Sequence, residues 1–154
     1  GYAAGDSTII KAMSKIQGQA TSCANSIGQI AAVEALTGDQ SAVKVMKKAF
    51  LKRRNKMIDR INKTAGISCQ TPGGAFYTFP DITHYLGRRI EGKKIDTSFD
   101  LSDYILDTAR TTTVAGAGFG CEGHIRLSYA TDEETFLEGL DRIEQSLMKL
   151  EETS

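Results

Sequence analysis

One arginine, Arg126, stands inside a stretch that otherwise has the pattern of a half-buried β-strand, CEGHIRLSYATDEE at residues 121–134. Apolar Ile125, Leu127 and Tyr129 recur at every second position, which places them on one face of a strand and the Arg126 side chain on the other. A guanidinium held on a stiff strand can bind an anion through two parallel hydrogen bonds, and it stays charged at any working pH. The pattern alone fits two interpretations equally well, an anion-binding arginine and a surface arginine in a local ion pair.

A second motif, AGAGFG at residues 115–120, resembles the glycine loop of dinucleotide-binding sites. In such a site the loop opens directly into a helix, and the N-terminus of that helix binds the pyrophosphate. Here the chain runs on to the strand of Arg126, so the sequence argues against a nucleotide site. We expect these glycines to let the backbone pass close to another surface or to a ligand.

No further pattern indicates a metal centre or a catalytic group. Cys121 and His124 have a C-x-x-H spacing, but two ligands do not make a zinc site, which takes three or four. We expect His84 to be solvated and His124 to have a structural role. Nothing like G-x-S-x-G marks an activated serine, and no pair of carboxylates stands out as general acid and base. From its residues alone, the chain offers one anion-binding arginine, no metal site and no catalytic residue.

The composition is that of a globular protein with room for one core, or at most two small domains, in 154 residues. Basic and acidic residues number 19 each, so no basic excess indicates nucleic acid as a partner. The longest apolar run is far too short to cross a bilayer. The three cysteines are widely spaced and favour reduced thiols over a disulfide framework. We therefore expect a cytoplasmic protein that binds neither nucleic acid nor membrane.

The first part of the chain predicts a strand end followed by helices. GYAAG, at residues 1–5, has the pattern of the end of a buried strand. Asp6 or the next residue can cap a helix with apolar residues at helical spacing, which we expect Gly18 to interrupt. A second helix is predicted to stop at Gly38, and a long amphipathic helix to run over about 41–64.

The remainder predicts strands that alternate with helices. Residues 67–82, ISCQTPGGAFYTFPDI, have the pattern of a hairpin with Pro72 and Gly73 in a type II turn, and Pro80 is expected to end the pairing of its return strand. Besides the Arg126 strand, the later elements expected are a helix over about 98–109, a strand at 111–115, and a last helix with a capping box at Thr131 and Glu134. This order predicts an α+β fold in which a mostly antiparallel sheet is covered by helices.

Five stretches carry a resemblance to a known family: GYAAGDSTIIKAMSKIQGQATS, AAVEALTGDQ, PGGAFYTFPDI, VAGAGFG and GHIRLSYATDEE. Together they resemble the C-terminal part of bacterial-type aspartate aminotransferases, within the pyridoxal-phosphate-dependent class I aminotransferases. The resemblance covers essentially the whole chain, which represents well under half of such an enzyme. It implies that residues 1–40 are the terminal strand and helices of the large, cofactor-binding domain. Residues 41–154, including the long linking helix, would then be the small C-terminal domain.

The resemblance also implies roles for individual residues. Arg126 would bind the α-carboxylate of an amino-acid substrate. Gly74 and Phe76 would line the substrate site in a segment that closes over it, although core packing is an equal interpretation for Phe76. Ser22 matches a turn that reaches the active site of the partner subunit in family dimers. The sequence departs from the family directly after Ser22, because residues 23–24 are Cys-Ala where Asn-Pro is usual.

Pyridoxal phosphate is the cofactor that the resemblance implies, with amino-acid and 2-oxo-acid substrates and a homodimer. The lysine that attaches the cofactor lies upstream of GYAAG in the family, and Lys11 and Lys15 cannot replace it because they lie on an amphipathic helix. We therefore expect a C-terminal fragment, inactive alone, of an enzyme that transfers an amino group between aspartate and 2-oxoglutarate. Two alternatives stay open: a family member with another amino-acid substrate, and a non-catalytic module that binds a carboxylate.

Overall fold

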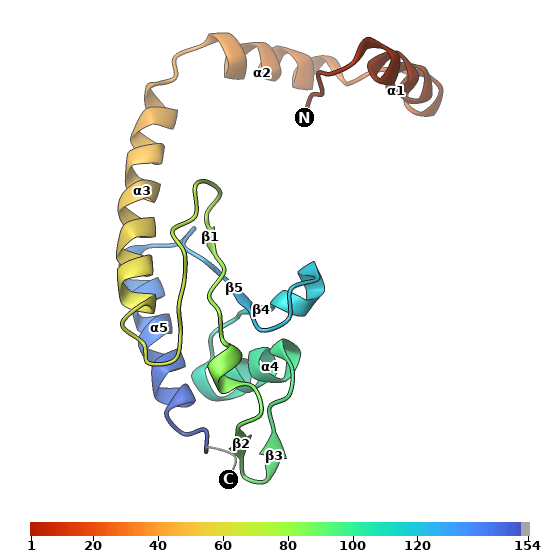
Figure 1. The fold of residues 1–154 in the computed structure, drawn as a ribbon. Helices are drawn as coiled ribbons and strands as arrows, with labels where there is room; N and C mark the ends of the chain where they lie inside the picture. Colours follow the sequence, from red (N-terminus) through yellow and green to blue (C-terminus); the bar gives the residue numbers. More distant parts are fainter. Residues whose placement is uncertain (152–154) are drawn as a thin grey trace. The chain divides into compact units, whose positions relative to one another are not determined.

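The structure is a computed structural model that describes residues 1–151 (Figure 1). Its elements follow in this order: α1 (Ser7–Ala20), α2 (Ser26–Thr37), α3 (Ser41–Ile61), β1 (Tyr77–Thr78), the 3-10 helix η1 (Thr83–Tyr85), β2 (Arg89–Ile90), β3 (Lys93–Lys94), α4 (Ser98–Ala109), β4 (Val114–Ala115), the 3-10 helix η2 (Gly116–Phe119), β5 (Ile125–Ser128) and α5 (Glu133–Leu147). They belong to two compact units, residues 1–43 and the residues from 44 onward.

The helices of the first unit follow the predicted caps. The carboxylate of Asp6 accepts a hydrogen bond from the backbone N–H of Thr8 at 2.8 Å and so caps α1. Gly38 is the C-cap of α2, as predicted. The expected interruption at Gly18 was wrong, because α1 continues through it to Ala20. A single glycine costs a helix only about 1 kcal/mol relative to alanine, which does not break a helix by itself.

The strand predicted at residues 1–5 was also wrong. These residues have no regular secondary structure and are exposed. A strand satisfies its backbone N–H and C=O groups by pairing with a neighbour, and no residue within the described range 1–151 pairs with this segment.

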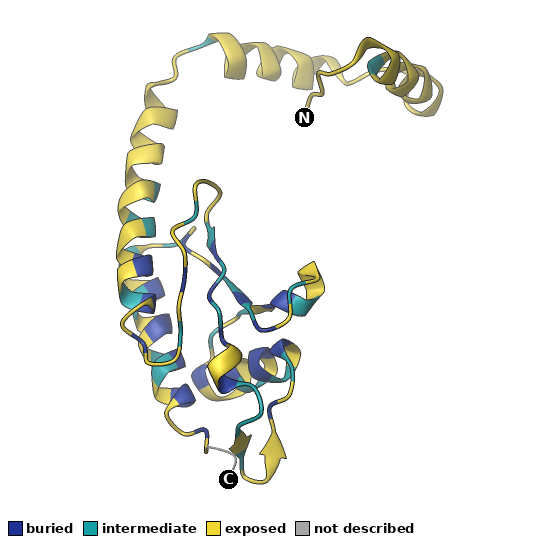
Figure 2. Ribbon diagram, in the orientation of Figure 1, coloured by how far each residue is buried: buried dark blue, intermediate teal, exposed yellow. Residues whose placement is uncertain are grey.

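Neither α1 nor α2 buries a residue (Figure 2). Both helices carry large apolar side chains that are exposed, namely Ile9, Met13, Ile16, Ile27, Ile30, Val33 and Leu36. The apolar stripe that the sequence shows on α1 therefore has no partner within the first unit. Within residues 1–151, no helix is both long and apolar enough to span a bilayer.

The second unit is built on a three-stranded antiparallel sheet with the order β1-β5-β4. Tyr77 lies opposite Ser128 in the pair β1–β5, and Val114 lies opposite Arg126 in the pair β4–β5. Strands β2 and β3 form a separate antiparallel hairpin. Because helices cover one face of this antiparallel sheet, the predicted α+β class is confirmed.

One face of the sheet packs against three helices to form the core (Figure 2). Ile125 and Leu127 of β5 point into this core and are 1% and 6% exposed. The helical side of the core consists of Met57, Ile58 and Ile61 of α3, Leu101, Ile105 and Ala109 of α4, and Phe136, Leu140, Ile143 and Leu147 of α5. Burial of these side chains is the main favourable term that holds the sheet against the helices.

The predicted hairpin at residues 67–82 was only partly correct. One isolated bridge, Ser68 to Asp81, joins its two arms, and β1 pairs with β5 instead. The expectation that Pro80 would end the pairing was wrong. Proline lacks an N–H, but the Pro80 carbonyl still accepts a hydrogen bond from the N–H of Ile125 at 3.1 Å. The ladder then continues with a bridge from Asp81 to His124.

The predicted capping box of the last helix was wrong by one residue. Asp132 caps α5, since its carboxylate accepts a hydrogen bond from the N–H of Thr135 at 2.8 Å. Thr131 lies one position too early for this role. Aspartate is as good an N-cap as threonine, so the local sequence fits either register.

Because no residue of α1 or α2 is buried, we expect both helices to be unstable in the isolated chain. Helices of about 12–15 residues are marginal in water without tertiary packing. We expect the amides of α1 and α2 to exchange with deuterium at close to the rate of an unstructured chain, and those of α4 and α5 to be strongly protected. Hydrogen exchange followed by mass spectrometry on the 154-residue chain measures this directly. Equal protection of α2 and α5 would contradict the prediction.

Candidate functional site

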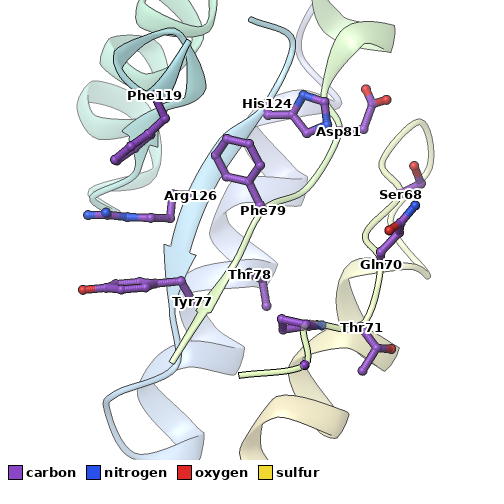
Figure 3. A pocket seen from close by; sticks show the side chains of 12 residues that line it. Ser68, Gln70, Thr71, Tyr77, Thr78, Phe79, Asp81, Phe119, His124 and Arg126 are labelled. Atoms are coloured by element: carbon purple, nitrogen blue, oxygen red, sulfur yellow. The ribbon is translucent and has the colours of Figure 1, made fainter. Parts of the chain in front are cut away.

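The face of the sheet opposite the core carries the polar and aromatic side chains of the site (Figure 3). Tyr77 is paired with Ser128 and Asp81 with His124, so both pairs belong to one continuous antiparallel register. Directly opposed residues share a face of a sheet, and so do residues two apart on one strand. This register therefore brings Arg126 onto the same face as Tyr77.

Arg126 is half-buried, and its guanidinium lies between two aromatic rings (Figure 3). Its central carbon is 4.3 Å from the centre of the Tyr77 ring and 4.8 Å from the centre of the Phe119 ring. Within residues 1–151, Arg126 has no carboxylate within ion-pair distance and no hydrogen-bond acceptor for its side chain. The N–H groups along the edge of the guanidinium are therefore free to bind an anion.

Arg126 lines an open cavity with a volume of about 840 Å³. The lining residues are Ser68, Gln70, Thr71, Pro72, Gly73, Tyr77, Thr78, Phe79, Asp81, Phe119, His124 and Arg126. They come from the segment before β1, from β1 and the residues after it, from η2 and from β5 with the residue before it. The cavity is large enough for a small organic anion.

The carboxylate of Asp81 and the imidazole of His124 share this cavity with Arg126. The carboxylate of Asp81 accepts hydrogen bonds from the N–H of Thr83 at 2.8 Å and from its hydroxyl at 2.7 Å. Both hydrogen bonds lower the pKa of Asp81 below its usual range, and the bond from the Thr83 hydroxyl has the larger effect. The ring of His124 stacks on Phe79, with the ring centres 5.0 Å apart and the planes at 16°. Asp81 and His124 are thus held by local partners, and Arg126 is the cation that the cavity offers to a ligand.

The glycine loop after β4 holds Phe119 over Arg126. The N–H of Ala117 donates to the hydroxyl of Ser98, at the start of α4, at 3.1 Å. In turn the N–H of Ser98 donates to the carboxylate of Glu122 at 2.6 Å. The loop is therefore attached at both of its sides to the first turn of α4. It forms η2 and then leads to β5, not to an α-helix.

Gly116 is where this loop needs a glycine. Its N–H donates to the carbonyl of His124 at 2.8 Å, and its own carbonyl accepts from Cys121 at 3.0 Å. A Cβ at this position would lie closer than 3.0 Å to the carbonyl oxygens of both residues. The prediction that a glycine here permits close backbone contact is confirmed at Gly116.

The other residues implied by the resemblance lie outside this cavity. Gly74 borders a second hollow of about 220 Å³, and its neighbour Gly73 reaches both hollows. Phe76 is 41% exposed, and its ring centre is 4.3 Å from that of Tyr77. Ser22 belongs to the first unit and has a positive φ of 65°, in the turn that follows α1. The substrate-binding roles of Gly74 and Phe76, and the contact of Ser22 with a partner subunit, stay predictions.

Three aromatic residues of the site were not predicted from the sequence as functional. Tyr77 and Phe79 could have been found, since they alternate in FYTFP as Arg126 does in its own strand. For Phe119 no signal of this kind exists. It is the last residue of η2, and the position of η2 is set by the hydrogen bond from Ala117 to Ser98, which lies earlier in the sequence.

Comparison with known proteins identifies the family of this chain. Residues 1–143 match the model of the aminotransferases of class I and II, so the chain belongs to this family. An aspartate aminotransferase of Rhizobium meliloti is 40% identical over 152 residues, which are 97% of this chain and 37% of that protein. An aspartate/prephenate aminotransferase of Nitrosomonas europaea is 41% identical over 145 residues, 93% of this chain and 36% of that protein.

The fold is also that of a solved member of the family. The crystal structure of the aspartate aminotransferase from Rhizobium meliloti superposes with a TM-score of 0.87 at 40% identity. The match covers 93% of this chain and 36% of that structure. The chain thus spans a little over a third of the length of the relatives that it matches.

Gly116 and Gly118 provide a matched test of the loop. Gly116→Ala should destabilise the second unit by roughly 1–3 kcal/mol, because the new methyl group meets backbone atoms that cannot move without distorting the strand pair. Gly118→Ala should change the stability by less than about 0.5 kcal/mol, since no heavy atom lies within 4 Å of its Cβ position. Urea unfolding of the 154-residue chain, followed by circular dichroism, gives both values. Equal stabilities of the two variants would refute the assigned role of Gly116.

Proposed function

We propose that this chain is the C-terminal part of a pyridoxal-phosphate-dependent aminotransferase, in which Arg126 binds the α-carboxylate of the substrate. The observation that carries the proposal is the environment of Arg126: a half-buried guanidinium, stacked on two rings, with no anionic partner among the described residues. Burial strengthens an ion pair with a ligand because the charges are less screened by water. A planar guanidinium can also bind a carboxylate through two parallel hydrogen bonds.

Binding the α-carboxylate would also orient the substrate. Two hydrogen bonds to one rigid group fix both the position and the plane of a carboxylate. Such positioning makes a following step effectively unimolecular and selects the bond that is cleaved. All amino acids and 2-oxo acids share this carboxylate, so Arg126 would serve both halves of an amino-group transfer.

The lining of the cavity indicates which part of the chemistry this chain would supply. Pyridoxal phosphate, when bound, supplies an electron-withdrawing ring system that stabilises a carbanion. Its attachment requires a lysine amine, and no lysine is among the residues that line the cavity around Arg126 within residues 1–151. The residues present fit a substrate carboxylate and do not fit the attachment of the cofactor. In this proposal the rest of the enzyme holds pyridoxal phosphate.

The proposal assigns residues 1–40 to the large, cofactor-binding domain and residues 41–154 to the small C-terminal domain of such an enzyme. Ser22 would contact the site of the partner subunit in a homodimer, and Gly74 and Phe76 would contact the substrate. The three cysteines, all of them free, favour a reducing compartment, so we place the enzyme in the cytoplasm.

Aspartate and 2-oxoglutarate are the substrates that we propose. The support is that several relatives of this chain are aspartate aminotransferases. The aspartate/prephenate aminotransferase of Nitrosomonas europaea supports a second candidate within the family, an enzyme that also accepts prephenate. Arg126 would have the same role in both, because it would bind the group that the substrates share.

Substitution of Arg126 in the complete enzyme tests the proposal. Removal of the partner of a buried carboxylate costs about 2–5 kcal/mol. We therefore expect Arg126→Ala to lower kcat/KM roughly 30-fold to several-thousand-fold. Arg126→Lys should lie between wild type and Arg126→Ala, since it keeps the charge but loses the planar pair of donors. Steady-state kinetics with aspartate and with a monocarboxylic amino acid should show the loss for both substrates.

Arg89 offers a matched control for this experiment. Its side chain donates to the carbonyl of Gly92 within the β2–β3 hairpin and does not line the cavity. Arg89→Ala removes the same charge and should leave kcat/KM near the wild-type value. Near-normal kcat/KM of Arg126→Ala for both substrates would mean that Arg126 is only a structural residue of its strand.

The 154-residue chain alone should not catalyse transamination. When it is supplied with pyridoxal phosphate, aspartate and 2-oxoglutarate, we expect no oxaloacetate above the background without protein, because its cavity lacks a lysine. A complete aspartate aminotransferase serves as the positive control in the same coupled assay. Sustained turnover by the chain, abolished by substitution of one of its lysines, would overturn this prediction.

A further inference from the structure

We propose that Tyr77 and Phe119 form an aromatic clamp, which positions the guanidinium of Arg126, and that tight carboxylate binding requires both rings in addition to the arginine. This inference rests on the proposed function, because it assigns positioning residues to the same site. The clamp is defined by the two rings on either side of the Arg126 guanidinium (Figure 3).

The geometry of the clamp determines which part of the guanidinium a ligand can reach. A cation over the face of an aromatic ring is attracted by the electron density of the ring. With Tyr77 at 4.3 Å and Phe119 at 4.8 Å, the two faces of the guanidinium are covered. Its N–H groups point outward in the plane between the rings. A carboxylate can therefore approach only along the edge, where the two parallel hydrogen bonds form.

Both rings are fixed by contacts of their own. Tyr77 is held in the ladder opposite Ser128, and the ring of Phe76 packs against it at 4.3 Å between centres. Phe119 meets the edge of the Phe79 ring at 6.2 Å and an interplanar angle of 82°. The clamp thus restricts the rotation of a long, flexible side chain before a ligand arrives. Such preorganisation lowers the entropy that binding must remove.

In this arrangement the role of the glycine loop is to hold Phe119 over Arg126. AGAGFG has no nucleotide to bind, yet the loop is tied to the first turn of α4 through Ser98 and passes close to β5 at Gly116. The result is that Phe119, the aromatic residue of the loop, lies over Arg126. Phe119 is 53% exposed and lines the same cavity as Arg126. Its contacts with Arg126 and Phe79 explain why it lies there.

The neighbouring carboxylate does not compete with a ligand for Arg126. Asp81 lies on the same face of the sheet, but its Oδ1 atom accepts both hydrogen bonds from Thr83. Within residues 1–151 no ion pair joins Asp81 to Arg126, so the edge of the guanidinium stays free while the two rings cover its faces. Covered faces together with a free edge distinguish this site from one in which the arginine lies between rings but already forms an ion pair within the protein.

Kinetics of the complete enzyme test the clamp. Tyr77→Leu and Phe119→Leu should each raise KM for aspartate and for a monocarboxylic amino acid roughly 2- to 30-fold, the range that corresponds to one cation–π contact. The value of kcat should change much less, because the contact helps ground state and transition state alike. Tyr77→Phe, which keeps the ring and removes only the hydroxyl, should recover most of the affinity that Tyr77→Leu loses.

Phe99 provides the control for loss of an exposed aromatic ring. It is 56% exposed, close to the value for Phe119, and it takes no part in the contacts of Arg126. Phe99→Leu should therefore leave KM unchanged. If Tyr77→Leu and Phe119→Leu give the same KM as Phe99→Leu while Arg126→Ala is impaired, the clamp is overturned and the proposed function stands. If Arg126→Ala is unimpaired, the proposed function itself fails.

A spectroscopic measurement on the 154-residue chain tests the clamp without any activity. Protons held over aromatic faces are shifted upfield, so the Nε–H signal of Arg126 in a ¹H–¹⁵N spectrum should lie upfield of those of exposed arginines. It should move toward their position in Tyr77→Leu and in Phe119→Leu, and stay in place in Tyr77→Phe and Phe99→Leu. A signal at the position of exposed arginines in the wild-type chain would overturn the clamp, whatever the kinetics show.

Discussion

The antiparallel register between residues 77–81 and β5 is the constraint on which the site depends. It pairs Tyr77 with Ser128 and Asp81 with His124, and it places Arg126 on the open face of the sheet. Side chains alternate with a period of two along a strand, so a slip of one residue would turn every side chain to the other face. Arg126 would then enter the core, and the two apolar residues beside it would enter water.

The core makes such a slip costly. Ile125 and Leu127 are almost completely buried against α3, α4 and α5, whereas the arginine between them is only half-buried. Exchange of the faces would expose two large apolar side chains and bury a charge without a partner, and each of these changes costs several kcal/mol. The same apolar contacts that stabilise the second unit therefore also determine where its cation lies. Stability and binding are coupled through one strand.

The sequence predicted those features that depend on local pattern. Alternation in IRLSY was sufficient to predict the face of Arg126, and helical spacing was sufficient to predict α2, α4 and α5, although the cap of α5 was placed one residue too early. The predictions failed where the answer depends on a distant partner. A hairpin was expected at residues 67–82 because its arms are adjacent in sequence, but β1 finds its partner in β5, about fifty residues later. Likewise the segment at residues 1–5 has the composition of a strand and no partner within residues 1–151. Phe119 could not be predicted, since the hydrogen bonds that position it run to the first turn of α4.

The use of aromatic rings beside Arg126, in place of a carboxylate, has a physical consequence for binding. A half-buried cation loses part of its hydration, and proteins commonly compensate with an internal ion pair. An internal carboxylate would have to be displaced before a substrate carboxylate could bind, so that one ion pair would only be exchanged for another. Tyr77 and Phe119 compensate through their faces and leave the hydrogen-bonding edge unused. An arriving carboxylate then adds an interaction that the free protein lacks, and the binding free energy is not reduced by the loss of an internal pair.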